Sequence, residues 1–296
     1  MLFLSNSIRS TSSTRSTRNI SPGIMDSEEV NPKVEELLKM PQYEQRTTAW
    51  YEQRKNAITA SDIPTVLGEN NYKTSWSLFL DKCNATEKPF VGNEATRWGN
   101  HYEDIAIEKY SELRNKKVLS FGLLIHRDYP WLGGSPDGIT TDGILLEVKC
   151  PLRRKIVHGE VPHHYLSQVL LNLEICDLDV AHFIEFIPGN SDDSYEINIV
   201  EVLRDREWFS TNIDKIKEFW DSVIEYRNVG IEKHPKYKNY KERSNNLKKN
   251  KQGVTLNLID SLEPKNKFVN FIESEESEEP DNTEQKVQFV NFIESE

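Results

Sequence analysis

The chain has 296 residues and a formal net charge of −11, and 36% of its residues are hydrophobic. This length suits one large domain or two small ones. No stretch approaches the roughly 18 apolar residues of a membrane span, so we expect a soluble protein without a membrane segment. Three cysteines at unrelated spacings, Cys83, Cys150 and Cys176, fit neither a disulfide framework nor a zinc site and indicate a reducing, intracellular compartment.

The net charge is divided unevenly along the chain. Residues 1–25 carry three arginines and no acid, residues 227–251 carry nine basic and two acidic residues, and residues 260–296 carry eleven acids and three lysines. Because much of the acidity lies in a tail, the negative total does not exclude a nucleic-acid ligand.

Residues 1–30 read as a leader rich in serine, threonine and arginine. This composition is typical of a mitochondrial transit peptide. It also fits a disordered leader, or translation that starts at Met25. We therefore expect the protein in the cytoplasm or nucleus, including that of a virus-infected cell, with the mitochondrion as the alternative.

Apolar residues three and four apart predict helices in the first part of the core. The segments are 32–40, 47–68, 75–84 and 95–113. Within the second segment we expect one helix to lead into another, which begins with Ser61 as its N-cap and ends at Gly68.

The pattern then changes toward strands. Residues 117–127 are rich in strand formers, 131–143 in turn formers, and 144–151 read as a strand ended by a proline. A helix, two strands and a closing helix are expected at 163–176, 180–187, 195–202 and 206–227. This order predicts an α/β core with a mixed central β-sheet flanked by helices.

The expected domain organisation has four parts. The core domain spans residues 31–228, order fades after residue 228, and a basic linker at 229–259 leads to an acidic tail at 260–296.

The segment 133–151, GGSPDGITTDGILLEVKCP, concentrates charged residues. The glycines and proline before Asp137 predict a bend, and Asp142-Gly143 predicts a hairpin turn. On the returning strand, Glu147 and Lys149 lie two apart and therefore share a face. The hairpin brings Asp137 back toward Glu147, so that two carboxylates converge beside an ammonium.

This trio suits metal-dependent hydrolysis. Mg²⁺ prefers oxygen ligands, with Mn²⁺ as a substitute, and the backbone carbonyl of Val148 could add a ligand to the two carboxylates. A lysine beside the metal can orient or deprotonate the attacking water. The pattern is short, however, and an ordinary hairpin with solvated charges is the alternative.

Four motifs occur in order along the core: WYEQRKNAITASD, RWGNHYEDIAIEKY, GGSPDG followed by LLEVKCP, and YLSQVLLNL. Together, across about residues 45–187, they resemble the lambda-exonuclease-like, YqaJ-type viral recombinase branch of the PD-(D/E)XK nucleases. The resemblance implies a restriction-endonuclease-like core.

The resemblance also implies roles for individual residues. Asp137 and Glu147 look like the metal-binding acids, Glu103 like the helical acid that completes the site, and Lys149 like the catalytic lysine. Gln168 resembles the glutamine on the helix behind the catalytic strands. The residues that resemble a site for a DNA 5′-phosphate are Arg54, Thr59 and Ser61.

Each assignment has an ordinary structural alternative. Arg54 could form a surface ion pair, the two hydroxyl residues could be helix caps, Glu103 could be solvated and Gln168 could bond a neighbouring loop. One position departs from the family, which often has Gln-x-Gln on that helix, because Leu170 takes the second position here.

The function implied by the resemblance is a metal-dependent DNA nuclease, a 5′→3′ exonuclease on double-stranded DNA ends that acts in recombination, repair or viral DNA processing. Two alternatives are a catalytically weak module that binds DNA ends and an endonuclease of the same fold. Ring-shaped oligomers occur in this family, so a homo-oligomer is among the expectations.

Two features lie outside the core. The basic segment 226–251 interleaves lysines with tyrosines, which suits a nucleic-acid backbone, a nuclear-localisation signal or a solvated linker. The motif FVNFIESE occurs twice, at 268–275 and 289–296. It reads as a docking motif for a single-strand annealing or replication/repair partner, or as a segment that folds back and competes with DNA.

Overall fold

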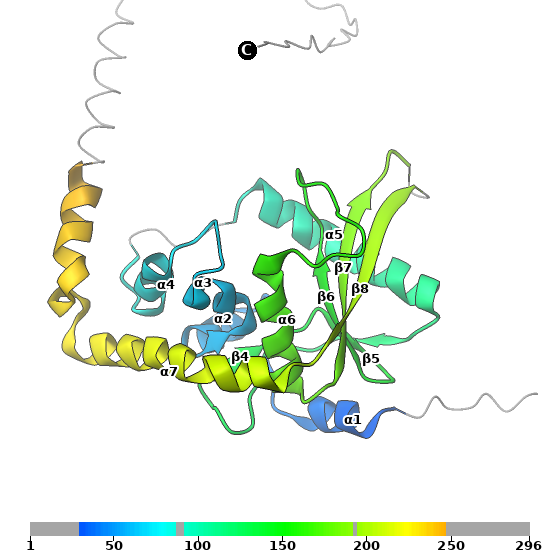
Figure 1. Ribbon diagram of the computed structural model, residues 1–296, viewed down its shortest axis with the longest axis horizontal. Helices are drawn as coiled ribbons and strands as arrows, with labels where there is room; N and C mark the ends of the chain where they lie inside the picture. The colour runs from blue at the N-terminus through cyan, green and yellow to red at the C-terminus, as the bar shows by residue number, and fades with distance from the viewer. Residues whose placement is uncertain (1–29, 87–91, 192–193, 247–296) are drawn as a thin grey trace, which may run out of the picture. The chain divides into compact units, whose positions relative to one another are not determined.

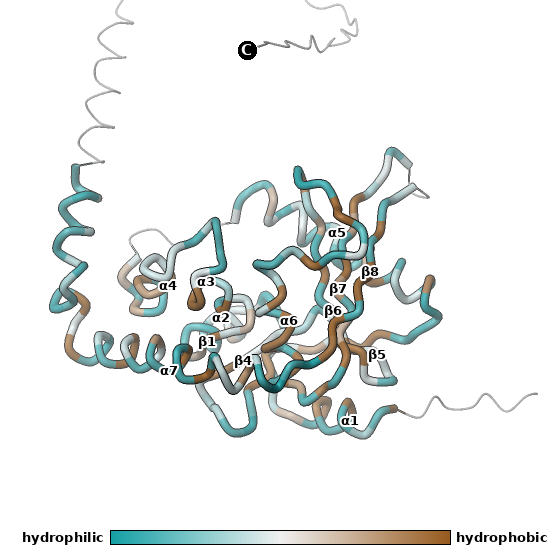
Figure 2. The backbone as a smooth tube through the Cα atoms, in the orientation of Figure 1, coloured by the Kyte–Doolittle hydropathy of each residue, from teal (hydrophilic) through white to brown (hydrophobic). Residues whose placement is uncertain are grey.

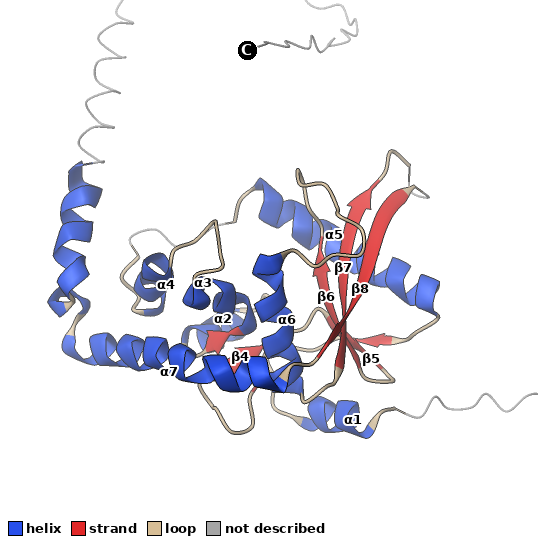
Figure 3. Cartoon of the chain, in the orientation of Figure 1, coloured by secondary structure: helices blue, strands red, loops and turns tan. Residues whose placement is uncertain are grey.

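A five-stranded mixed sheet forms the centre of the fold (Figures 1 and 3). Strands β6 and β7 run parallel and all other neighbours run antiparallel, which confirms the expected mixed sheet. The strand order is β2 (Val118–Leu119), β5 (Gly138–Thr140), β6 (Ile144–Lys149), β7 (Val180–Pro188) and β8 (Tyr195–Leu203).

This is a computed structural model, and it describes residues 30–86, 92–191 and 194–246. Residues 1–29 of the leader, residues 247–259 of the basic linker and the whole acidic tail with both FVNFIESE repeats lie outside the described residues. The described residues up to Tyr237 belong to one compact unit, and the second begins at Lys238. Residues 238–246 of the second unit are helical.

A small second sheet lies beside the central one. Its order is β1 (Ile58–Thr59), β4 (Leu132–Gly134) and β3 (Leu124–Ile125), with β1 parallel and β3 antiparallel to β4. The chain therefore crosses from β4 in the small sheet to β5 in the central sheet within three residues, and Asp137 is the last of them.

Helices precede, cover and close the two sheets. They are α1 (Pro32–Lys39), α2 (Thr48–Lys55), the 3-10 helix η1 (Ala60–Asp62), α3 (Ile63–Leu67), α4 (Ser75–Lys82), α5 (Glu94–Arg114), α6 (His163–Cys176), α7 (Arg206–Val229) and the 3-10 helix η2 (Ile231–Lys233). In the described part of the chain, no helix combines the length and the apolar character of a membrane span.

The central sheet is covered on both faces, which explains its apolar strands (Figure 2). Helix α5 packs on one face through Ala106 and Tyr110, which meet Leu146 and Val148 of β6. Helix α6 lies on the other face, in the larger cluster that includes Leu145. Because side chains alternate along β6, Glu147 and Lys149 share the α6 face with Leu145.

The expected helices at 32–40, 75–84, 95–113, 163–176 and 206–227 are confirmed, as are the strands at 144–151, 180–187 and 195–202. The hairpin turn at Asp142-Gly143 is also confirmed, since Gly143 has a φ of +97° and donates its N–H to the Thr140 carbonyl at 2.9 Å.

Three expectations were wrong in detail. Gly133 and Gly134 lie in buried strand β4 rather than in a bend, and the bend falls on Asp137, after Ser135 and Pro136. Ser61 is not the cap, because Asp62 accepts from both the N–H (3.0 Å) and the hydroxyl (2.8 Å) of Thr59 and so fixes the turn that starts there. Order does not fade directly after residue 228, because η2 and helical residues continue to residue 246; the rest of that expectation, for residues 247–296, lies outside the described residues.

Candidate active site

Asp137 is bound to strand β6 by its backbone and its side chain. Its N–H donates to the Leu146 carbonyl at 3.1 Å, and its Oδ2 accepts from the Val148 N–H at 2.6 Å. Burial and the neighbouring Glu147 raise the pKa of Asp137 well above its ordinary value. The hairpin therefore brings the two carboxylates together, as the sequence predicts.

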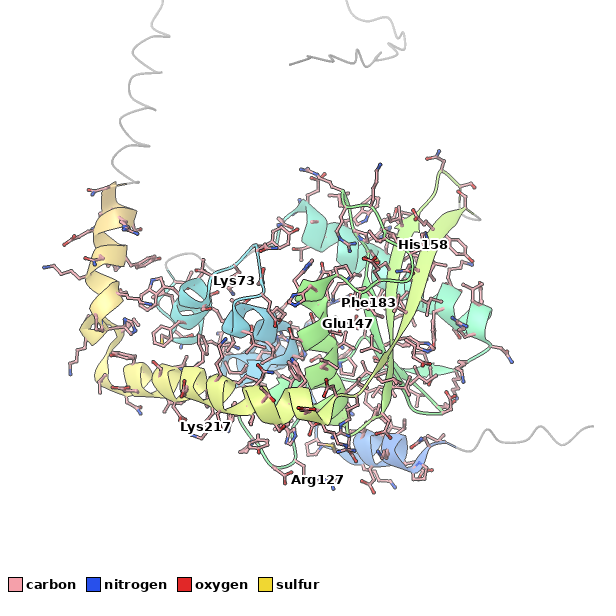
Figure 4. All side chains as sticks on the ribbon, in the orientation of Figure 1. Lys73, Arg127, Glu147, His158, Phe183 and Lys217 are labelled. Carbon is pink, nitrogen blue, oxygen red and sulfur yellow. The ribbon has the colours of Figure 1, made fainter. Side chains whose placement is uncertain are left out.

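Glu147 is deeply buried, with 1% of its surface exposed, and lies at the centre of the site (Figure 4). Its Oε1 accepts from Lys149 Nζ and from Gln168 Nε2, and its Oε2 accepts from Asn172 Nδ2 at 3.0 Å. Each oxygen thus has a donor on α6, which holds the carboxylate in one orientation.

Asn172 is a site residue that the sequence reading missed. It is fully buried and lies four residues after Gln168, so both amides face the strands from the same side of α6. Leu170, at the position where the family often has a second glutamine, packs in the apolar core. The second side-chain amide that bonds Glu147 is that of Asn172. The i, i+4 spacing of two amides on an apolar helix was the signal that could have revealed it.

Lys149 lies at the end of β6, beside Glu147 and 5.3 Å from the centre of the Tyr165 ring. Burial alone would lower the pKa of Lys149, but Glu147 and Asp137 outweigh that effect and raise it above its ordinary value. The ammonium is therefore the charged partner of both carboxylates in this arrangement.

Glu103 approaches from α5, on the other side of the strand. Its Oε2 pairs with Arg46 Nη2 at 2.9 Å, and 22% of its side chain is exposed. Burial raises its pKa, and Arg46 offsets this only in part. Arg46, which has a φ of +67°, is a second residue without a sequence signal.

A hollow of about 300 Å³ joins these elements. Glu103 from α5 and Lys149 from β6 both line this hollow. Cys150 also faces this hollow, and burial raises the pKa of its thiol to about 12, so the thiol is neutral at physiological pH.

The acids fit a hard cation by their chemistry. Besides burial, the charges of Glu147 and Glu103 raise the pKa of Asp137, and Glu147 also acts to raise the pKa of Glu103; a bound cation relieves this repulsion. Their oxygens are engaged with protein donors, and within residues 30–86, 92–191 and 194–246 no three His, Cys, Asp or Glu side chains form a group that could hold a metal ion. Binding of a metal would therefore require these side chains to turn.

Arg54 and Ser61 form a second polar cluster close to the acids. Arg54 Nη2 donates to Ser61 Oγ at 2.7 Å, and its guanidinium carbon lies 4.3 Å from the centre of the Trp50 ring. Burial lowers the pKa of Arg54, while Glu147 is among the acids that oppose this shift, which puts the two clusters within electrostatic reach. Trp50 also donates to Ser135 Oγ at 2.9 Å, just ahead of Asp137.

Thr59 is placed differently from its two companions. It is fully buried, and its hydroxyl donates to Asp62 and lies 3.2 Å from Ser61 Oγ. Thr59 therefore helps to hold the Ser61 side chain in place from the buried side. Asp62 in turn pairs with Lys82 Nζ at 2.8 Å.

A comparison with known families bears on this arrangement. Residues 49–179 match the model of the YqaJ-like viral recombinase domain. This segment of the chain is therefore similar to that domain. All of the site residues described above except Arg46 lie within the matched segment of this domain.

Three relatives are similar to part of this chain. Protein R354 of Acanthamoeba polyphaga mimivirus is 34% identical over 172 residues, which cover 52% of this chain and 31% of that protein. Protein YqaJ of Bacillus subtilis is 27% identical, over 59% of this chain and 56% of that protein. Protein D345L of African swine fever virus is 28% identical, over 45% of this chain and 46% of that protein. The chain thus spans between 31% and 56% of the length of these relatives.

The fold of the chain is also found in a solved structure. An alkaline exonuclease from Laribacter hongkongensis, LHK-Exo, superposes with a TM-score of 0.52 at 22% identity, covering 62% of this chain and 95% of that one. The chain therefore shares the fold of this exonuclease, and the expected α/β fold with a mixed central sheet flanked by helices is confirmed.

Proposed function

We propose that this protein is a metal-dependent deoxyribonuclease, a 5′→3′ exonuclease that degrades one strand from double-stranded DNA ends in recombination, repair or viral DNA processing. The observation that carries the proposal is that Asp137 and Glu147 meet across the β5–β6 hairpin beside Lys149. Lys149 and Glu103 line one hollow. The likeness to LHK-Exo, which is an alkaline exonuclease, supports the reaction class.

The residues that would hold a divalent ion, Mg²⁺ with Mn²⁺ as a substitute, are Asp137, Glu147, Glu103 and the carbonyl of Val148. Such an ion would supply positive charge against a phosphodiester. Lys149 Nζ contributes a donor and a charge at the same point, and Gln168 keeps the Glu147 carboxylate turned toward the lysine.

Arg54 and Ser61 are suited to bind the 5′-phosphate of the strand being degraded. A guanidinium binds phosphate through two parallel N–H groups, and the hydroxyl of Ser61 lies within its reach. The contact of Arg54 with Trp50 fixes the plane of the guanidinium.

The proposal is tested with linear duplex DNA labelled at its 5′ or 3′ end, incubated with the protein in Mg²⁺ and in EDTA. We expect mononucleotides from the 5′ end in Mg²⁺ and no release in EDTA. Asp137→Ala and Lys149→Ala should each abolish release while the circular dichroism spectrum is retained. Cleavage at the wild-type rate by either variant in Mg²⁺ would show that the assignment is wrong.

Two rival functions give different results in the same assay. An endonuclease cuts a covalently closed circle, whereas an exonuclease leaves it intact. A module that only binds DNA ends retards labelled duplex in a gel but releases no nucleotide in any divalent metal.

We also propose that the acidic tail recruits a single-strand annealing or replication/repair partner through its two FVNFIESE motifs. Removal of residues 260–296 should then leave cleavage of naked DNA unchanged and abolish capture of the partner. A large gain in cleavage rate would instead mean that the tail competes with DNA.

A further inference from the structure

Glu185 is a buried carboxylate that the proposed chemistry does not use. It lies on β7 with none of its surface exposed, and in the parallel register of the two strands it is the partner of Lys149. Its Oε1 pairs with Arg154 Nη2 at 2.5 Å, and its Oε2 accepts from Asn198 Nδ2 at 3.1 Å. A carboxylate buried in this way costs several kcal/mol unless it is paired, so Glu185 holds the partly exposed Arg154 beside it.

Arg154 lines the same hollow as Glu103 and Lys149, with 31% of its side chain exposed. Its guanidinium carbon lies 5.9 Å from the centre of the Tyr165 ring, and Lys149 Nζ lies 5.3 Å from that centre. Two cations therefore meet one aromatic ring at the edge of the hollow.

The guanidinium of Arg154 keeps hydrogen-bonding capacity for a ligand. Its buried Nη2 forms an ion pair with Glu185 but makes no hydrogen bond in the described part of the chain, and its Nη1 donates to the Lys155 carbonyl at 3.4 Å. A guanidinium carries five N–H groups, and in the described part of the chain these two contacts account for two of them. The others are available to an acceptor that enters the hollow.

Asn198 fastens the loop that carries Arg154. Besides its bond to Glu185, it accepts from the Gly159 N–H at 3.1 Å and lies 3.4 Å from the carbonyls of Val157 and Glu160. The segment between β6 and α6 is thus bound to β8, and Arg154 is placed before any ligand arrives.

We propose that Arg154 binds a phosphodiester group of the DNA strand that lies in the hollow, and that Glu185 and Asn198 are the positioning residues that hold it there. This inference rests on the proposed function only in naming DNA as the ligand. The competing explanation is that Arg154 does no more than neutralise Glu185.

The test measures the affinity for duplex DNA with a 5′-phosphate, in EDTA to prevent cleavage, over a range of salt concentrations. Each phosphate contact contributes about 0.7–0.9 to the slope of log K against log salt. We expect Arg154→Gln to lower the magnitude of the slope by about that amount and to weaken binding equally for unrelated sequences. The matched control is Arg127→Gln, because Arg127 also pairs with a glutamate, Glu36 at 3.2 Å, but is 81% exposed and lies outside the hollow (Figure 4).

The positioning role is tested by Glu185→Gln, which keeps the shape of the side chain and removes its charge. It should weaken DNA binding about tenfold, as loss of a charge-assisted contact does, but only while Arg154 is present. In the Arg154→Gln background the same change should have no further effect on affinity. An equal loss in both backgrounds would overturn the positioning role, and an unchanged salt slope for Arg154→Gln would overturn the phosphate contact.

The outcomes also separate this inference from the proposed function. If the wild-type protein binds DNA but releases no nucleotide, the nuclease assignment is wrong, and the slopes still decide the role of Arg154. If it cleaves DNA and Arg154→Gln keeps the wild-type slope, only the inference is wrong. Absence of DNA binding at low salt would overturn both.

Discussion

Asn172 Nδ2 on α6 donates to Glu147 Oε2 on β6 at 3.0 Å, and the two residues are 25 positions apart along the chain. Gln168 serves the other oxygen of the same carboxylate. One face of α6 therefore determines how the buried carboxylate is turned, and the neighbouring Lys149 is oriented with it.

Replacing Asn172 with alanine should impair both stability and activity. The change leaves Glu147 Oε2 buried without a donor, which costs about 1–3 kcal/mol. We expect a lower unfolding free energy in urea and a lower cleavage rate. The control is Asn212→Ala on α7, because the Asn212 amide bonds only its own helix, through the Trp208 carbonyl at 2.8 Å. Wild-type stability in Asn172→Ala would refute the role of this hydrogen bond.

Gly134 keeps the space in which Asn172 sits. A Cβ added at Gly134 would lie 2.3 Å from Asn172 Oδ1 and 3.1 Å from Ile175 Cδ1. Gly134→Ala should therefore displace the Asn172 amide and lower the cleavage rate. In the Asn172→Ala background the same change should cost much less, because the clashing oxygen is gone. Equal costs in the two backgrounds would mean that Gly134 matters for another reason.

The sequence predicts the part of the site that is built from residues close together along the chain. Asp137 and Glu147 are ten residues apart and are joined by one tight turn at Asp142-Gly143, so the alternation of strand side chains suffices to bring them together. Asn172 and Glu185 reach the site through the packing of α6 and β7, and no short-range pattern encodes that packing.

The same reason explains the strands that the sequence could not place. Residues 117–127 read as one strand-rich stretch, but β2 joins the central sheet and β3 joins the small sheet. Gly122 lies between them, where a Cβ would come within 2.0 Å of the Tyr43 carbonyl oxygen. A contact with a residue about 80 positions earlier therefore divides the stretch in two.

The pair formed by Asp62 and Lys82 should stabilise the part of the fold that carries Thr59. Lys82 Nζ lies 2.8 Å from Asp62 Oδ2 and also donates to the carbonyls of Arg54 (2.8 Å) and Ala57 (2.6 Å), and both charged side chains are largely buried. Lys82→Met should lower the unfolding free energy by about 3–5 kcal/mol, because it leaves a buried carboxylate unpaired. The double variant with Asp62→Asn should recover part of that loss. An unfolding free energy within error of the wild type for Lys82→Met would exclude this role.

The lowered pKa of Asp62 also predicts how the free energy of unfolding depends on pH. Although its burial acts to raise the pKa, Lys82 and then Arg54 outweigh this and lower the pKa from 3.8 to about 2. The folded state therefore binds this proton less readily than the unfolded state, so the stabilisation is complete above pH 3.8 and is lost as the pH falls toward 2. Urea titrations between pH 5 and 2 should show a smaller decline for Asp62→Asn than for the wild type. Parallel declines would contradict the assignment.

The cluster of Arg54 and Ser61 yields the last prediction. Because Arg54 Nη2 and Ser61 Oγ are 2.7 Å apart, a 5′-phosphate that binds one can reach the other. Arg54→Gln and Ser61→Ala should each raise KM for DNA with a 5′-phosphate by about tenfold or more, as loss of a hydrogen bond to a charged group does. Neither change should affect KM for ends with a 5′-hydroxyl.

Thr59 provides the matched control for this preference. It is fully buried and gives its hydroxyl to Asp62, so Thr59→Val removes a structural bond and leaves the Arg54 guanidinium in place. Thr59→Val should lower the melting temperature while the ratio of KM values for the two kinds of DNA end stays near the wild-type ratio. A ratio that falls equally in all three variants would mean that the cluster supports the fold without distinguishing the ends.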